Sequence, residues 1–133
     1  IAGDYLSNIE FPFIYHSSVE YVKTLEKLPR IHDRNWFTRL IPGHGAPALT
    51  INDWLQRRTD SLAYIYALRE SIAMGTPFDE ETFLRRYQFP RMQRKEHEAN
   101  ITLLRKEHEQ GLWTWDPDNV PVLPEPIPFG ETT

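Results

Sequence analysis

This 133-residue chain contains no cysteine, which excludes a disulfide framework and any thiolate-ligated metal site. No apolar run approaches the roughly 20 residues that a membrane-spanning helix needs. Positive charge is also scarce, since 15 Lys and Arg stand against 19 Asp and Glu, and the net charge is -4. We therefore expect a cytoplasmic protein with no membrane partner, and we do not expect it to bind nucleic acid.

The composition that remains is that of a folded protein. Hydrophobic residues make up 40% of the chain and charged residues 26%, which is typical of a globular protein with a modest core. The sequence begins at Ile1 instead of a methionine and runs at once into "AGDYLSN". We therefore expect it to be a piece of a longer protein.

The first part of the chain predicts a strand, a helix and a second strand. Aromatic and β-branched residues in "IAGDYLSNIEFPFIYHSS" favour a strand end followed by a loop. Ser17 and Glu20 form a capping box, and the apolar residues after it predict a short helix that Pro29 ends. "WFTRLI" predicts a second strand, buried on both faces. Because two strands rarely form an independent sheet, we expect them to pair with sequence outside this chain.

Helices dominate the rest of the prediction. A long helix is expected from a cap at Thr50 or Asp53 to a stop at Gly75. Its apolar positions are Trp54, Leu55, Leu62, Ile65, Leu68 and Ile72. A shorter helix is expected over residues 79–87, and a last one from Pro90 to about Gln110 with Gly111 beyond it.

The tail after the last helix carries five prolines and cannot form regular ladders. It predicts an extended strap in which Trp113, Trp115 and Phe129 dock on the body of the protein.

Two short motifs suggest a metal site. Gly3-Asp4 comes at the end of the first predicted strand, and Gly43-His44-Gly45 follows the second. In a layered α/β fold, strand ends at one edge of the sheet converge, and ligands bind there. A carboxylate and an imidazole suit a divalent ion such as zinc, manganese or iron, and the neighbouring glycines let the backbone pass close to it.

The order of these motifs resembles a known family. The segments "AGDYLSNIEFPFIYHSSVEYVKTLEKL" and "RLIPGHGAPALTINDWLQRRTDSLAYIYALRES" look like the C-terminal half of a metallo-β-lactamase-fold hydrolase. In that family a strand ends in Gly-Asp, a Ser-capped helix follows, the next strand delivers "PGHG", and a long helix comes after it. The resemblance runs from Ala2 to about Ser71, roughly half of the chain, and the last helix matches the family's closing helix more loosely.

The resemblance implies the fold class and the division of the chain. It implies an α/β fold, rich in helix, that is the C-terminal half of an αββα sandwich with extra C-terminal helices. Residues 1–75 would belong to the metallo-β-lactamase-like domain and residues 76–112 would be closing helices. The proline-rich tail would cover residues 113–133.

The resemblance also implies a hydrolase site. Asp4 matches the carboxylate that bridges two zinc ions, and His44 matches a histidine ligand of the second ion. A metal in such a site lowers the pKa of a bound water to about 7. The implied substrate is a small molecule with an ester, thioester, lactone, amide or phosphodiester bond. Phe11, Phe13 and His16 would line the substrate mouth, and no catalytic residue beyond the metal ligands is expected.

The chain departs from the family in lacking its "HxHxDH" cluster and its later single histidine. We therefore expect the N-terminal half of the same protein to supply the other ligands. This chain alone should bind no metal tightly and should be inactive. The rival hypothesis is a non-catalytic helical interaction piece, or a winged-helix-like module formed by the residues from Phe78 onward.

The two histidines of the last predicted helix could be metal ligands or part of an exposed, charged face. His97 and His108 in "RKEHEANITLLRKEHEQ" lie on one face, but they lack the spacing of a zinc-binding HExxH motif. Charged pairs four residues apart, such as Arg94 with Glu98, instead predict an exposed, solvated face.

Overall fold

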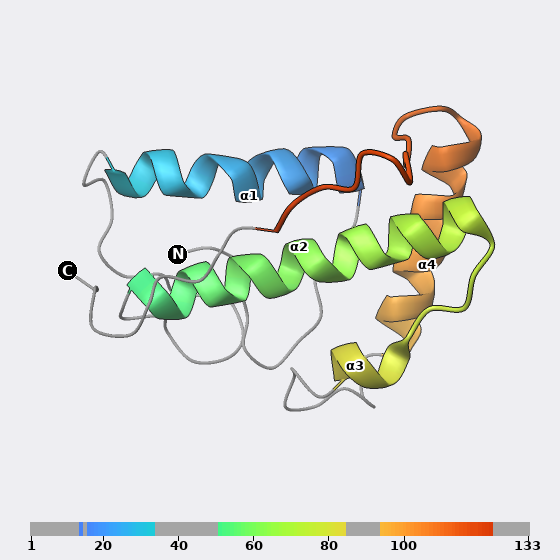
Figure 1. Cartoon of the computed structure of the whole chain (residues 1–133), viewed down its shortest axis with the longest axis horizontal. Helices are drawn as coiled ribbons and strands as arrows, with labels where there is room; N and C mark the ends of the chain where they lie inside the picture. The colour runs from blue at the N-terminus through green and yellow to red at the C-terminus, as the bar shows by residue number, and fades with distance from the viewer. Residues whose placement is uncertain (1–13, 15, 34–50, 85–93, 124–133) are drawn as a thin grey trace.

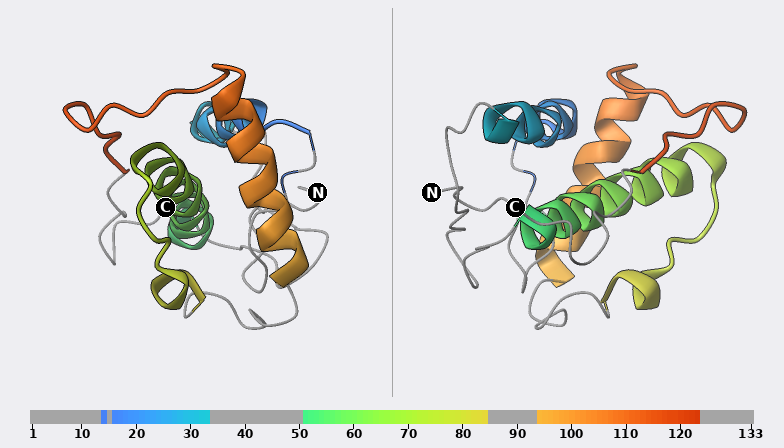
Figure 2. Two further views of the ribbon diagram at one scale, coloured as in Figure 1. Left: turned by 90° about the vertical axis from the view of Figure 1, so that its right-hand side faces the viewer. Right: turned by 60° about the vertical axis from the view of Figure 1, so that its left-hand side comes forward.

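Four helices form the regular secondary structure of the residues that the computed structural model describes, which are residues 14, 16–33, 51–84 and 94–123 (Figure 1). They are α1 (Ser18–Asp33), α2 (Ile51–Met74), α3 (Glu80–Leu84) and α4 (Arg94–Glu109). α2 packs against both α1 and α4. Figure 1 shows α1 and α2 running antiparallel and α4 crossing the C-terminal half of α2 steeply, and Figure 2 shows the steep angle between α2 and α4 from a further side.

The predicted αββα sandwich is wrong. The described residues form helices and no strand, so their apolar faces pack helix against helix instead of against a sheet. Apolar side chains of α2 pack against α1 and α4 in the core of the described residues. The two predicted strands fall in residues 1–13 and 34–50, outside the described residues.

The core is built around α2. Trp54, Tyr64, Ile65 and Leu68 have almost no exposed surface. The side chains that meet them from the other described segments are Ile14, Tyr21, Val22, Leu25, Phe83, Leu104 and Trp113. The predicted stripe of α2 is therefore confirmed at its central positions, and Tyr64 joins it as a fully buried aromatic residue.

The start of α1 follows the predicted cap. The Glu20 backbone N–H donates to the Ser17 hydroxyl oxygen at 3.2 Å, as expected of a helix N-cap. The Glu20 carboxylate forms an exposed ion pair with Lys23 at 3.3 Å.

Pro29 does not end α1, because the helix continues through it to Asp33. Proline has no N–H, so the carbonyl of Leu25, four residues earlier, loses its usual helical donor. The Arg58 Nε of α2 donates to that carbonyl at 2.7 Å. Arg58 is buried, and its bond replaces the missing backbone bond with one from another helix.

α2 and α4 end just before the glycines that were predicted to stop them, Gly75 and Gly111. Gly75 and Gly111 have φ angles of 67° and 70°, a region that side chains disfavour. The Thr76 N–H donates to Ser71 O at 3.2 Å after α2, and the Leu112 N–H donates to Glu107 O at 2.9 Å after α4. Both bonds span five residues, which is the pattern of the Schellman motif.

The other expected boundaries are met in part. α3 lies inside the predicted residues 79–87, of which residues 85–87 are outside the described residues. α4 lies inside the predicted last helix, whose proposed start at Pro90 is outside the described residues.

The segment after α4 docks through tryptophan. The Trp113 indole N–H donates to Leu104 O at 3.1 Å, and the ring is buried. The Arg69 guanidinium lies 5.5 Å from the centre of that ring and 5.9 Å from the Tyr66 ring. The predicted docking of Trp113 is confirmed and Trp115 packs against the core in part, whereas Phe129 lies outside the described residues.

We predict that Arg58 and Pro29 are energetically coupled. Arg58→Met should lower the free energy of unfolding by about 2 kcal/mol, because it leaves the buried Leu25 carbonyl without a donor. In a Pro29→Ala background the alanine N–H can bond that carbonyl, so the same change should cost less than about half as much. Urea unfolding of the four proteins measures both costs.

Lys27, an exposed cation of α1, serves as the control. Lys27→Met should change stability by no more than about 0.5 kcal/mol. Equal costs of Arg58→Met in the two backgrounds would show that the hydrogen bond to Leu25 does not compensate for Pro29.

Candidate functional site

Most residues predicted to form the site lie outside the described residues. This holds for the expected metal ligands Asp4 and His44 and for Phe11 and Phe13. His16 is described, and its side chain is exposed just before the cap of α1.

The inward face of α4 carries polar residues, and one of them, His97, was expected to lie in solvent. His97, Asn100, Leu104 and Glu107 are buried, and His97 is only 5% exposed. Their spacing of three, four and three residues is that of one helix face. The prediction of an exposed, solvated face is therefore wrong at His97, because the charged pairs four residues apart lie on the outer side of the helix and do not report on the face that carries His97. The Arg94–Glu98 pair does form on the outside, at 3.7 Å.

Tyr64, Glu80, His97 and Asn100 form a polar group within this core, the His97 cluster. The Tyr64 hydroxyl lies 2.6 Å from His97 Nδ1. The Asn100 side-chain amide donates to the same hydroxyl oxygen at 3.0 Å. His97 Nε2 lies 3.7 Å from a Glu80 carboxylate oxygen. The group therefore links α2, α3 and α4.

The hydrogen bonds assign the protons of the cluster. Asn100 Oδ1 accepts from the Ile14 backbone N–H at 3.1 Å, which leaves its NH₂ to donate to Tyr64. The phenol oxygen thus accepts one bond and gives its proton to His97 Nδ1. A neutral His97 then carries its proton on Nε2, the nitrogen that faces Glu80.

Burial sets the protonation of both rings. Burial raises the pKa of the Tyr64 hydroxyl above its ordinary value, so Tyr64 stays a donor. Burial also lowers the pKa of His97, although the neighbouring Glu80 carboxylate acts in the opposite direction. Phe78 covers the imidazole, with ring centres 5.1 Å apart.

A second buried link joins α4 to the start of α1. The Glu107 carboxylate accepts the Ser18 backbone N–H at 3.0 Å and the Ser18 hydroxyl at 2.5 Å. A carboxylate at a helix N-terminus satisfies an N–H with no helical partner and faces the positive end of the helix dipole. Together with the bond from Ile14 to Asn100, it fixes the chain as it enters α1.

The His97 cluster has the order carboxylate, imidazole and hydroxyl, which is also the order of a proton relay. A relay acts on a substrate through its terminal hydroxyl, and Tyr64 has 0% of its surface exposed. The contacts of the cluster therefore hold α2, α3 and α4 together. The sequence signal that could have located it is that His97, Asn100 and Glu107 fall on the same face of α4 as Leu104.

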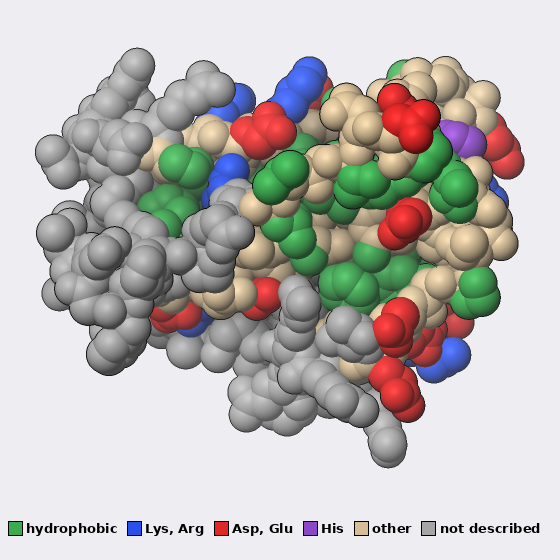
Figure 3. Space-filling view, in the orientation of Figure 1, with side chains coloured by type: hydrophobic (Ala, Val, Ile, Leu, Met, Phe, Trp, Pro, Cys, Tyr) green, Lys and Arg blue, Asp and Glu red, His purple; other side chains and the backbone are tan. Residues whose placement is uncertain are grey.

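The described residues contain no group of three or more His, Asp or Glu side chains placed to hold a metal ion. Nor does any helix among them have the length and apolar character needed to cross a membrane. Figure 3 shows Lys and Arg side chains lying apart from one another on this face of the described residues, among hydrophobic and acidic ones.

Comparison of the chain with protein-family models, with curated proteins and with solved structures finds no match.

We predict that His97 makes the protein acid-sensitive. Its lowered pKa means that the unfolded chain, with a histidine pKa near 6.5, binds the proton more readily than the folded one. The stability that neutral His97 provides is therefore complete above pH 6.5 and is lost as the pH falls below it. The loss is at most about 1.4 kcal/mol per pH unit.

Urea unfolding between pH 7.5 and 5 tests this prediction in wild type, His97→Gln and His16→Gln. The glutamine at position 97 cannot titrate, so His97→Gln should flatten the fall below pH 6.5. His16→Gln, at an exposed position, should leave it unchanged. The same acid slope in all three proteins would rule out His97 as its source.

Proposed function

We propose that the four helices support a metal-dependent hydrolase centre to which this chain contributes Asp4 and His44. The proposed metal is zinc, with manganese or iron as substitutes. The proposed substrate is a small molecule that contains an ester, thioester, lactone or phosphodiester bond. The N-terminal half of the same protein would supply the remaining ligands, and the cytoplasm would be the compartment.

The observation that carries this proposal is the double attachment of the chain where it enters α1. Ile14 is bonded to Asn100 and Ser18 to Glu107, and all four residues are buried. Ile14 follows Asp4 by ten residues in the sequence. A catalytic ligand must be held to within a fraction of an ångström, which requires a fixed support.

The helices also agree with the order of motifs on which the resemblance rests. α1 follows the Gly-Asp motif with its Ser17 cap, and α2 follows "PGHG" and ends at Gly75. His44 lies between Asp33, where α1 ends, and Ile51, where α2 begins. α1 and α2, the helices that precede and follow the segment containing His44 in the sequence, pack against each other.

The two candidate ligands fit such a metal in chemical type. A carboxylate and a neutral imidazole are ligands that zinc accepts, and a bound metal would supply Lewis acidity to the reaction. Two protein ligands do not complete even one zinc site. We therefore propose that this chain supplies only part of the ligand set of the metal centre.

A specific observation favours the rival function, a helical piece that binds another protein. Leu112, Val120 and Val122 are 55%, 51% and 91% exposed on the segment after α4. Exposed apolar side chains mark an interaction surface where they form one contiguous patch, so the rival function requires that these three side chains meet the partner together.

Metal analysis separates these functions. The longer protein, including the sequence N-terminal to Ile1, should bind about two equivalents of zinc, the number that a dinuclear centre requires. Asp4→Asn and His44→Ala should each remove at least one of them. Elemental analysis after dialysis gives the stoichiometry without any assay of activity.

The control is His16→Ala, which removes an exposed imidazole of this chain and should leave the metal content unchanged. The 133-residue chain alone should retain no metal. A longer protein that is metal-free with His44 in place would contradict the hydrolase proposal and favour the interaction function.

A further inference from the structure

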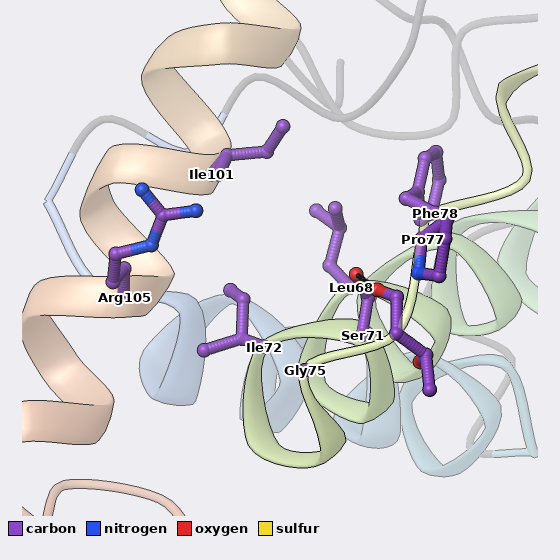
Figure 4. Close-up of a pocket in the computed structure, with 9 residues that line it drawn as sticks. Leu68, Ser71, Ile72, Gly75, Pro77, Phe78, Ile101 and Arg105 are labelled. Carbon is purple, nitrogen blue, oxygen red and sulfur yellow. Dashed lines mark hydrogen bonds between the residues drawn. The ribbon is translucent and has the colours of Figure 1, made fainter.

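A cavity of about 370 Å³ opens beside the end of α2 (Figure 4). Leu68 and Ile72 of α2 line it together with Ile101 and Arg105 of α4, and Phe78 lines the side formed by the segment after α2. Figure 4 shows the Arg105 guanidinium directed into the space between the two helices. Ligand sites for small molecules span about 300–1,000 Å³, so this cavity matches a ligand at the small end of that range.

The walls of the cavity are fixed by contacts of their own. The Ser71 hydroxyl donates to Thr76 O at 2.6 Å, which holds the turn at Gly75 closed. The Phe78 ring stacks on Phe83 with centres 5.2 Å apart and meets Tyr64 edge-on at 5.8 Å. A ligand would therefore enter a space that exists without it, and would not bear the cost of ordering these walls.

The lining combines an apolar floor with one positive charge. Ile72, Ile101 and Phe78, which are half-buried, supply the apolar surface. Among the described residues, no Asp or Glu lines the cavity, and Arg105 forms no ion pair with any of them. A guanidinium beside apolar side chains is suited to a carboxylate, which it can bind through two parallel hydrogen bonds.

We propose that this cavity binds a small organic carboxylate with an apolar body. The carboxylate pairs with Arg105, and the body lies on Ile72, Ile101 and Phe78. The charge of Arg105 excludes cationic ligands, and the volume excludes a folded partner. This site is separate from the metal centre proposed above, and it requires neither Asp4 nor His44.

Three probes with the same eight-carbon chain test the proposal, namely octanoate, 1-octanol and octylamine. Each is titrated into the 133-residue chain in the presence of a chelator, so that no metal holds the carboxylate, and amide and methyl NMR shifts are followed. Octanoate should shift the signals of Leu68, Ile72 and Ile101. It should bind about tenfold more tightly than the alcohol, as a charge-assisted hydrogen bond allows, and the amine should bind weakest.

Two charge-reversal variants on α4 make the test specific. Arg105→Glu should invert the order of the charged probes, so that octylamine binds more tightly than octanoate. A gain of binding cannot result from a failure to fold. Lys106→Glu reverses a neighbouring exposed charge outside the cavity and should leave the order unchanged.

Three results would overturn the proposal. Shifts that do not map to the cavity would place the ligand elsewhere. Equal affinity for octanoate and 1-octanol would remove the role of Arg105. An equal response of Arg105→Glu and Lys106→Glu would show that the effect is one of overall charge.

Discussion

A single side-chain amide, that of Asn100, joins three distant parts of this chain. Its oxygen accepts the backbone N–H of Ile14, 86 residues earlier, and its nitrogen donates to the Tyr64 hydroxyl of α2. Both bonds are buried, and a buried polar group left without a partner costs roughly 1–3 kcal/mol. The amide can satisfy both partners only when α4, α2 and the start of α1 are in place together. The helix arrangement depends on this requirement.

The same principle recurs at the other polar sites of the core. Pro29 removes a donor inside α1 and Arg58 supplies one from α2, while Ser18 begins α1 and Glu107 caps it from α4. In each case a backbone group that its own helix leaves unsatisfied is bonded by a side chain from another helix. Apolar packing alone tolerates sliding between helices, whereas such bonds fix their register.

Features that depend on neighbouring residues were predictable from the sequence. The Ser17 cap and the glycine ends at Gly75 and Gly111 are local, because a short hydroxyl side chain and a positive φ determine them. Features that depend on distant residues were not. Pro29 was expected to end a helix, because a proline lacks the N–H of a helical hydrogen bond. The compensating donor, Arg58, lies 29 positions further along the chain, so the sequence around Pro29 does not reveal it.

The fold class and the buried face of α4 also depend on contacts between distant residues, and neither was predicted correctly from the sequence. The sandwich was inferred from the order of two motifs, and the described residues instead bury the α2 stripe between helices. The inward face of α4 was missed because His97, Asn100 and Glu107 are hydrophilic, although their spacing is that of a buried face. Asp4 and His44 were predicted from sequence and lie outside the described residues, so they stay predictions.

The structural support and the proposed metal ligands lie in different parts of the chain. The four helices provide a fixed support, whose attachment to the segment before α1 consists of the bonds made by Asn100 and Glu107. The chemistry that we propose depends on Asp4, in the sequence before that attachment, and on His44, in the connection between α1 and α2.

Native-state hydrogen exchange of the Ile14 and Ser18 amides measures whether α4 fixes the chain where it enters α1. If α4 holds the entry into α1, both amides should exchange as slowly as core amides of α2, through opening of the whole helical body. Asn100→Ala should release the Ile14 amide more than the Ser18 amide, and Glu107→Gln should do the reverse. If both amides of the wild-type protein exchange at the rate of an unprotected peptide, α4 does not hold the entry into α1.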